Sequence, residues 1–276
     1  MRVEYRPLNE ANLADLVCCP GGLEVAGKGF TGRLDGVTEW HRDRLREGMR
    51  GLVAYAEGGP RGFVEIAPAD VAPFPIEAPG ACVLLCFHWA GTEPEDPRHL
   101  DEERRMIEAA IVDVRREFTG MAAIGWNHPT HYPIALLLLL GFREIARDEP
   151  IALLWLPFRK EAPAPRLARS CFRPRNLRER GLLAIDQAWS ARCPYSVHFA
   201  ERMRAIVAAH PDRERIDLCQ YRIDTRDEAF RLATSPWDWG WTYLNGEEIS
   251  LFQLRGDGLR DELAHRVASL PGSAAA

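Results

Sequence analysis

The sequence has no apolar run long enough to cross a lipid bilayer. A transmembrane helix needs about 20 consecutive apolar residues, whereas the longest candidate, IALLLLL at 134–140, is bounded by Pro133 and Gly141. The segment MRVEYRPLNE at 1–10 also lacks the apolar stretch of a secretory signal. We therefore expect a cytoplasmic protein that neither spans nor binds a membrane.

The chain also lacks an excess of positive charge. Its 276 residues include 35 Lys and Arg against 40 Asp and Glu, a net charge of -5. Nucleic acids and anionic surfaces attract proteins through clustered positive charge, so we do not expect nucleic acid as a partner. The 7 cysteines are an odd number without paired metal-binding spacing, which favours reduced thiols over a disulfide framework.

The chain is long enough for two domains, and a segment rich in proline and arginine at 159–180 separates them. Proline fixes φ and removes an amide donor, so this segment cannot continue as one helix or as a central strand. We predict a first domain at 1–158, a connector at 159–180 and a smaller second domain at 181–270. Strands and helices alternate in both domains, which predicts the α/β (α+β) fold class.

The second half of the first domain has the clearest pattern. ACVLLCFHWAG at 81–91 is a nearly continuous apolar run, typical of a strand covered on both faces. Residues 100–120 have an apolar stripe at helical spacing and end in glycine, which predicts a helix. A buried strand at 121–126, a short apolar helix before Gly141-Phe142 and one long closing strand at 143–158 are expected to follow.

This order of elements, with Gly141-Phe142 before the closing strand, resembles the GNAT acetyltransferase fold. The resemblance implies a mixed sheet that binds acyl-CoA between the strands at 81–91 and 121–126. The implied activity is transfer of an acyl group, such as acetyl, to a small amine. By the same resemblance, acetyl-CoA is the expected cofactor and its contacts are Phe87, His88, Arg98 and Asn127.

Two features depart from the family pattern. Members bind the diphosphate of CoA with a glycine-rich loop at a helix N-terminus, which uses backbone amides and the helix dipole. Here the loop 92–103 reads TEPEDPRHLDEE, and no glycine occurs between Gly91 and Gly120. Its acids are expected to repel a diphosphate, with Arg98 and His99 as partial compensation: Glu93, Glu95, Asp96, Asp101, Glu102 and Glu103. The tyrosine that often protonates the departing CoA thiolate is replaced by Leu137.

Histidines suggest where proton transfer would occur. His131 follows the strand at 121–126, at the end of the sheet where α/β folds place ligands. His88 lies on the neighbouring strand, so His88 and His131 are candidate general bases, with His128 and Tyr132 as candidate substrate contacts. Together with Glu24 or Asp70 the histidines could hold a metal, but His-Pro and Tyr-Pro pairs are typical of turns and we expect no metal.

The second domain contains Cys193-Pro194-Tyr195-Ser196 between a predicted strand at 182–189 and a predicted helix at 197–210. The predicted order is β-α-β-α-β-β-α, and Ser235-Pro236 precedes the third strand. This pattern resembles the thioredoxin fold, in which that proline is cis. A GNAT domain followed by such a domain is the arrangement of YoaP-type proteins.

The helix dipole would favour a thiolate at Cys193. Because Ser196 replaces the second cysteine, no disulfide can form within the motif, and the domain could act only as a monothiol. Cys219 is expected to point into the core. Trp237 and Trp239 alternate with Trp241 at strand spacing, and they are expected either to cover a small ligand beside Cys193 or to pack internally.

Two hypotheses follow. In the first, the protein is a GNAT-type acyltransferase in which Cys193, His88 and His131 are the candidate catalytic residues and a small amine or thiol is the substrate. In the second, the first domain binds no CoA and the second domain acts as a monothiol redox or small-ligand binding module. A homodimer remains open in either hypothesis.

Overall fold

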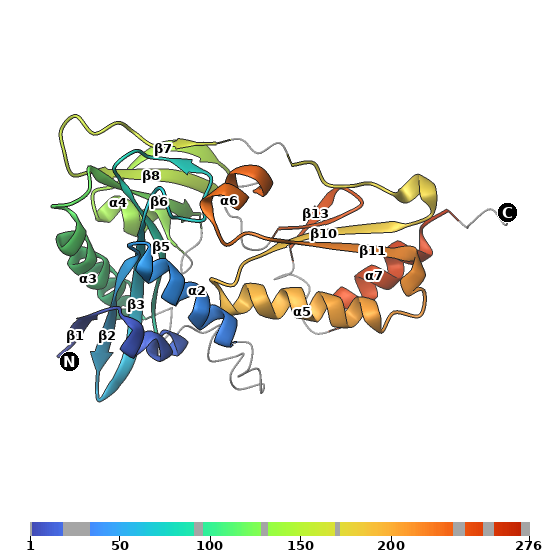
Figure 1. Cartoon of the computed structure of the whole chain (residues 1–276), viewed down its shortest axis with the longest axis horizontal. Helices are drawn as coiled ribbons and strands as arrows, with labels where there is room; N and C mark the ends of the chain where they lie inside the picture. Colours follow the sequence, from blue (N-terminus) through green and yellow to red (C-terminus); the bar gives the residue numbers. More distant parts are fainter. Residues whose placement is uncertain are drawn as a thin grey trace. The chain divides into compact units, whose positions relative to one another are not determined.

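The computed structural model of the protein describes residues 2–18, 34–90, 96–127, 132–168, 172–233, 241–250 and 257–271. They form two compact units, Met1–Ala168 and Arg169–Ala276, which are shown in Figure 1. The division between the units falls within the predicted connector at 159–180. No helix in the described part of the chain is long and apolar enough to cross a membrane.

Unit 1 is built on a seven-stranded mixed sheet with the order β1-β2-β3-β5-β6-β8-β7. Its strands are β1 (Glu4–Pro7), β2 (Arg50–Ala56), β3 (Gly59–Pro68), β5 (Cys82–Trp89), β6 (Gly120–Trp126), β7 (Arg143–Asp148) and β8 (Ile151–Pro157). Among these described strands only β5 and β6 pair in parallel. A small second sheet joins β4 (Ile76–Glu77) to β9 (Arg166–Leu167).

Helices cover both faces of this sheet. On one face, α3 (Pro97–Val114) and α4 (Ile134–Leu139) pack into the main core with inward side chains of the central strands, among them Val64 and Ile66. Between those two residues Glu65 points to the opposite face, because side chains alternate along a strand. There it contacts His41 of α2 (Leu34–Arg46), which packs beside the 3₁₀ helix η1 (Glu10–Cys18).

Two boundaries differ from the sequence prediction. The helix expected at 100–120 ends at Val114, and Gly120 instead begins β6. A Cβ at Gly120 would lie 2.2 Å from the Trp155 ring, so this glycine is required for close packing and does not end the helix. The prediction of one closing strand at 143–158 is also wrong, because β7 and β8 form an antiparallel hairpin. Pro150 between them lacks the amide that a continuous strand would need.

Unit 2 contains a four-stranded sheet with the order β11-β10-β12-β13. Its strands are β10 (Leu183–Trp189), β11 (Ile216–Arg222), β12 (Thr242–Leu244) and β13 (Glu247–Ile249). The helices are α5 (Pro194–Ala208), α6 (Arg226–Leu232) and α7 (Gly258–Ala268), with short 3₁₀ turns η3 (Arg178–Arg180) and η4 (Arg213–Arg215). β10 and β11 run parallel, whereas β12 is antiparallel to both of its neighbours.

The order β10-α5-β11-α6-β12-β13-α7 is the order predicted from the sequence. α5 and α7 share one apolar core with β10, and α6 packs in a second cluster around Trp241. Asn245 and Gly246 join β12 to β13 with φ of 47° and 84°, the positive values that a type I′ turn requires at both central residues. Part of the predicted connector belongs to this unit, since the Arg175 guanidinium donates to buried Asp186 of β10 at 2.7 Å.

Candidate functional site

The central feature of unit 1 is a split between its two parallel strands. β5 and β6 pair only at Cys82–Leu84 with Met121–Ala123, although both strands continue further. The pairing of β5 with β3 shifts by one residue at the same point, so that Leu85 is an extra residue in β5. Such a bulge bends a strand and increases its twist. The bulge at Leu85 therefore directs the second half of β5 away from β6.

Tyr132 links the two strands beyond this point. Its carbonyl oxygen accepts a hydrogen bond from the Trp126 amide of β6 at 2.8 Å, and its hydroxyl donates to the Cys86 Sγ of β5 at 2.7 Å. The Tyr132 ring also packs edge-on against Phe87, with the centroids 4.9 Å apart. Tyr132 adopts φ of 49°, a conformation uncommon outside glycine. Tyr132, two residues before α4, is thereby held to both strands.

A pocket of about 510 Å³ lies where α3, α4 and the end of β6 meet. Its walls combine apolar side chains with a few polar ones: Leu100, Asp101, Arg104, Trp126, Asn127, Pro133, Ile134, Ala135, Leu136 and Leu139. Leu139 is 78% exposed, which is unusual for a residue of this size beside a pocket. Of the predicted cofactor contacts, Asn127 lines the pocket. Its backbone amide donates a hydrogen bond to the Pro150 carbonyl at 2.7 Å.

The N-terminus of α3 already carries an anion. The carboxylate of Asp96 caps the helix by accepting from the Arg98 amide at 2.9 Å, and it also binds the Arg98 guanidinium at 2.5 Å. The hydrogen bonds from Arg98 lower the pKa of Asp96 to about 2. Arg98, a predicted cofactor contact, is therefore engaged with the helix cap, and Asp96 occupies the place where the family pattern would put a diphosphate.

A buried cluster lies next to this helix start. His99 and Glu103 of α3 are each 1% exposed, and His99 Nε2 lies 3.4 Å from Glu103 Oε1. The ring of His88, a half-buried residue of β5, lies 5.9 Å from the His99 ring between centroids. Burial raises the pKa of Glu103, and His99 and the Trp89 backbone only partly oppose this shift. Glu103 thus points into the protein, whereas the sequence suggested an acid that repels diphosphate.

The opposite face of the sheet has a second buried pair that sequence reasoning missed. His41 Nε2 lies 2.8 Å from Glu65 Oε1, and His41 Nδ1 lies 2.7 Å from the Val37 carbonyl. Both side chains are 3% exposed. One signal was available, because Glu65 is an acid within the apolar strand GFVEIAP, and such a residue needs a buried partner.

The other predicted site residues of unit 1 lie in different places. The Phe87 side chain belongs to the apolar core, so only its backbone can face a ligand in the split. Asp70 lies in the turn after β3 and is not in the described His88, His99 and Glu103 group. The predicted residues His128 and His131, and Glu24, lie outside the described residues.

In unit 2, Cys193 occupies the N-cap position of α5 and Pro194 its first turn. Cys193 is half-buried, and none of the four cysteines whose side chains are described is in a disulfide. Cys219 of β11 is also half-buried. Ser196 is 2% exposed, and its Oγ accepts from the Ser190 amide at 2.8 Å.

The loop before Cys193 is organised by Asp224. Asp224 Oδ1 accepts from the Ser190 hydroxyl at 2.9 Å and from the Ala191 amide at 2.7 Å. This carboxylate therefore holds the backbone that leads into α5. Trp241 is 3% exposed and packs with Phe172, Tyr221 and Tyr243. Trp237, Trp239 and Ser235-Pro236 lie outside the described residues.

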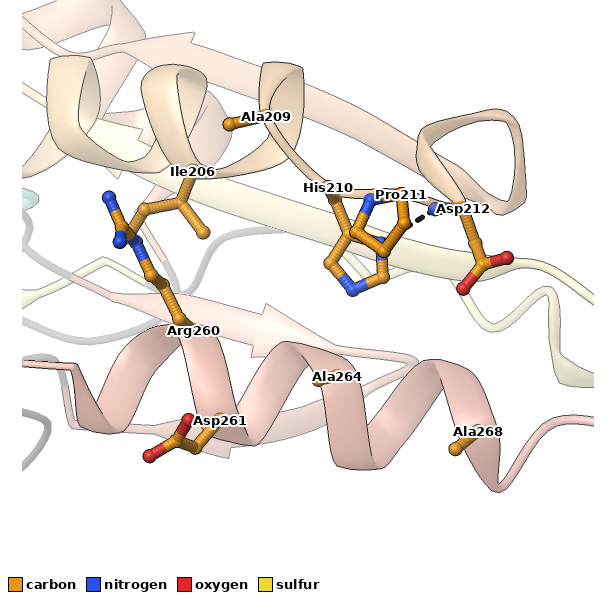
Figure 2. Close-up of a pocket in the computed structure, with 9 residues that line it drawn as sticks. All are labelled: Ile206, Ala209, His210, Pro211, Asp212, Arg260, Asp261, Ala264 and Ala268. Atoms are coloured by element: carbon orange, nitrogen blue, oxygen red, sulfur yellow. Dashed lines mark hydrogen bonds between the residues drawn. The ribbon is translucent and has the colours of Figure 1, made fainter.

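A second pocket, of about 360 Å³, lies between the end of α5 and the face of α7, and Figure 2 shows its lining. His210 Nδ1 accepts from the Asp212 amide at 3.1 Å, so this imidazole helps to form the turn. Cys193 starts α5 and His210 follows its end, and at about 1.5 Å per residue the helix separates them by roughly 25 Å. The pocket is therefore remote from the thiol.

No family model matches this chain, and no curated protein matches it. Solved structures do resemble it. They include aminoglycoside 6'-acetyltransferase type Ii, at 12% identity and a TM-score of 0.41 over 57% of this chain and 97% of that chain. Another is yncA, a putative acetyltransferase from Salmonella typhimurium with acetyl-CoA. Its sequence identity is 14% and its TM-score is 0.42, over 59% of this chain and 98% of that chain. A third is a GNAT family acetyltransferase from Brucella melitensis with acetyl-CoA. Its sequence identity is 13% and its TM-score is 0.40, over 62% of this chain and 97% of that chain.

Proposed function

We propose that unit 1 is a GNAT-type N-acyltransferase that binds an acyl thioester along the outer half of β5 and transfers the acyl group to a small amine. The observation that carries this proposal is the bulge at Leu85 together with the end of β5–β6 pairing at Leu84. Beyond this point one edge of β5 is not covered by β6. A strand edge can bind an extended chain through its backbone groups, and the amide-containing pantetheine arm is such a chain.

The two parts of acyl-CoA fit the described residues differently. The pantetheine arm suits the edge of β5 and the partly apolar pocket beside Asn127. The diphosphate does not suit the start of α3, because Asp96 already supplies a carboxylate there and engages Arg98. We therefore expect binding to depend mainly on the pantetheine and acyl portions, with little contribution from the nucleotide.

In the reaction, the amine nitrogen attacks the thioester carbonyl, a C–N bond forms, the C–S bond breaks and the donor leaves as a thiolate. The amine must lose a proton in this process. His88, on the outer half of β5, is the described candidate to accept that proton, either directly or through a water that it orients. Backbone amides of the same strand would polarise the thioester carbonyl. Leu137 has a hydrocarbon side chain with no acidic proton, so it cannot protonate the thiolate, which would have to leave unprotonated or take a proton from solvent.

The test is amine-dependent release of thiol from acetyl-CoA and acetyl-pantetheine by the full chain, across a panel of primary amines. His88→Gln should lower kcat by about 100-fold, in the range typical for loss of a general base. His265→Gln is the matched control, since His265 is exposed on α7 of unit 2. If no amine increases thiol release from either donor, the acyltransferase proposal is wrong.

A second candidate function belongs to unit 2. The observed order of strands and helices, with Cys193 at the N-cap of the 15-residue helix α5, supports a thioredoxin-like monothiol module of the YoaP type. Cys193 would attack a disulfide such as oxidised glutathione, forming a mixed disulfide and releasing one thiolate. Ser196 is buried and hydrogen-bonded, so it takes no part in the exchange.

Mass spectrometry of the intact protein after incubation with oxidised glutathione tests this second candidate. One glutathione should be added to the native protein and none to Cys193→Ser. Cys219→Ser is the control, because Cys219 is equally half-buried but lies on a strand. Equal modification of wild type and Cys193→Ser would rule out Cys193 as the reactive thiol.

A further inference from the structure

Three potential metal ligands converge between β5 and the start of α3. The ligand atoms of His88, His99 and Glu103 all lie within 4.8 Å of one another. His99 and Glu103 are four residues apart on α3, which places them on the same face of the helix. His88 reaches them from the neighbouring strand. Two imidazoles and one carboxylate in this arrangement can bind one ion from one side.

The spacing of the innermost pair matches that of two ligands of one ion. His99 Nε2 and Glu103 Oε1 are 3.4 Å apart. A hydrogen bond between a charged imidazole and a carboxylate is shorter, about 2.7–2.9 Å. Two ligands bound at about 2.0–2.2 Å to one tetrahedral zinc ion are roughly 3.4 Å from each other. The pair therefore already has the separation of two ligands.

Glu103 has unused coordinating capacity. Its Oε2 is buried and has no hydrogen-bond partner among the described residues, and the side chain is only 2% exposed. A buried carboxylate needs a partner or a bound ion to offset its loss of hydration.

The His41–Glu65 pair on the other face of the sheet provides an internal comparison. It has the same residue types and is also almost fully buried, but its nitrogen–oxygen distance is 2.8 Å. The second nitrogen of His41 contacts the Val37 carbonyl. That pair forms a hydrogen-bonded unit, and among the described residues no third potential metal ligand is grouped with it, whereas His88 joins His99 and Glu103.

We propose that His88, His99 and Glu103 bind a divalent transition metal ion of the zinc type. A set of two imidazole nitrogens and one carboxylate oxygen suits Zn²⁺ and similar ions. His88 is the half-buried member of the set, so the ion and a fourth ligand would enter from its side. Three protein ligands with one open position are typical of catalytic zinc sites, where water occupies the fourth position.

The metal site would add to the proposed acyl transfer without depending on it. A metal-bound water can ionise near pH 7, and in the metal-bound protein this water, in place of the coordinated His88, would be the proton acceptor beside the outer half of β5. The metal site is tested by binding alone, so its failure leaves the acyltransferase proposal intact, and the failure of acyl transfer leaves the metal site intact.

The experiment is titration of the chelator-treated full chain with Zn²⁺ by calorimetry, together with metal analysis after dialysis and the visible spectrum of the Co²⁺ form. Wild type should bind one equivalent, and the Co²⁺ form should show the absorption bands of a four-coordinate site. Glu103→Gln preserves size and should weaken binding by more than about 100-fold, because even changes to residues that only hydrogen-bond to a metal ligand weaken metal binding about 10- to 100-fold. Glu65→Gln, in the comparison pair, should bind like wild type.

Comparison of variants also separates this site from metal bound by cysteines elsewhere. If Glu103→Gln does not fold, as judged by circular dichroism, the variant His88→Gln is used instead, because His88 is only half-buried. It should show the same loss of Zn²⁺ affinity. Equal Zn²⁺ affinity and stoichiometry in wild type and in the folded ligand variant would overturn the proposal. Absence of binding to wild type at micromolar protein would do so as well.

Discussion

Ser196 occupies the position of the second cysteine in a C-x-x-C motif, and its surroundings explain what a serine does there. Its side chain is 2% exposed and its Oγ accepts from the Ser190 amide at 2.8 Å. This bond closes the turn between β10 and α5, and Asp224 fixes the same turn from the other side. Ser196 is therefore part of the support for the loop that carries Cys193.

Replacing this hydroxyl should weaken the fold by a moderate amount. Ser196→Ala leaves the buried Ser190 amide without its acceptor, and we expect the free energy of unfolding to fall by about 1–3 kcal/mol. Urea unfolding of the full chain measures this loss. Ser269→Ala is the control, because Ser269 donates to the Arg266 carbonyl at the exposed end of α7. Equal effects of the two substitutions would contradict this role for Ser196.

Cys82 gives a prediction about alkaline pH. The thiol is fully buried, and desolvation raises its pKa from 9.0 to about 12. Between these values the folded protein keeps a proton that the unfolded chain releases, so stability is fully present below pH 9 and falls as pH rises toward 12. Cys82→Ala should reduce this alkaline decline, measured by chemical unfolding from pH 8 to 11. The same slope in both proteins would contradict the assignment.

At the scale of elements, the start of α3 differs from the glycine-rich helix start that the sequence resemblance implied. Asp96 and Arg98 together satisfy the helix terminus that would otherwise bind an anion. A donor that lacks the nucleotide should then bind almost as well as one that has it. This expectation follows from the cap alone and does not depend on residues 91–95.

Asp96→Ser tests the cap directly. Serine is an equally good N-cap residue, so the helix should be retained while the carboxylate is removed and Arg98 is released. We expect CoA to bind about 3- to 10-fold more tightly, because the substitution removes a negative charge that repels the CoA diphosphate at a helix N-terminus. Acetyl-pantetheine, which has no diphosphate, is the matched ligand and should be unaffected. Calorimetric titration of both ligands gives the answer, and an equal change for the two would count against this interpretation.

The sequence was informative about elements that bury one continuous apolar run. The strand at 81–91 was predictable for this reason, and the order of strands and helices in unit 2 was predictable from their alternation along the sequence. The bulge at Leu85 was not predictable, because every residue around it is apolar and either register would bury the strand. The partnership of His99 and Glu103 was also missed, since an acidic segment at a helix start looks solvated until the helix is packed.

At the scale of the whole molecule, each unit has its own apolar core: α3 and α4 close one in unit 1, and α5 and α7 close another in unit 2. Because the two units do not share a core cluster among the described residues, we expect one cooperative unfolding step for each unit. A ligand that binds the native form of only one unit should stabilise only the corresponding step. The ligand response of the two transitions therefore assigns acyl-donor binding to a unit.

The most direct test is differential scanning calorimetry of the full chain during titration with acetyl-CoA. The account predicts two transitions. The midpoint temperature of the unit 1 transition should rise saturably with acetyl-CoA, while that of the unit 2 transition should not change. The unit 2 transition is identified as the one whose midpoint falls in Ser196→Ala. At 100 times the Kd the ligand should add about 2.7 kcal/mol to the stability of unit 1. No shift up to several millimolar acetyl-CoA, or a shift confined to the transition that Ser196→Ala weakens, would contradict the claim that the split beside β5 binds an acyl donor.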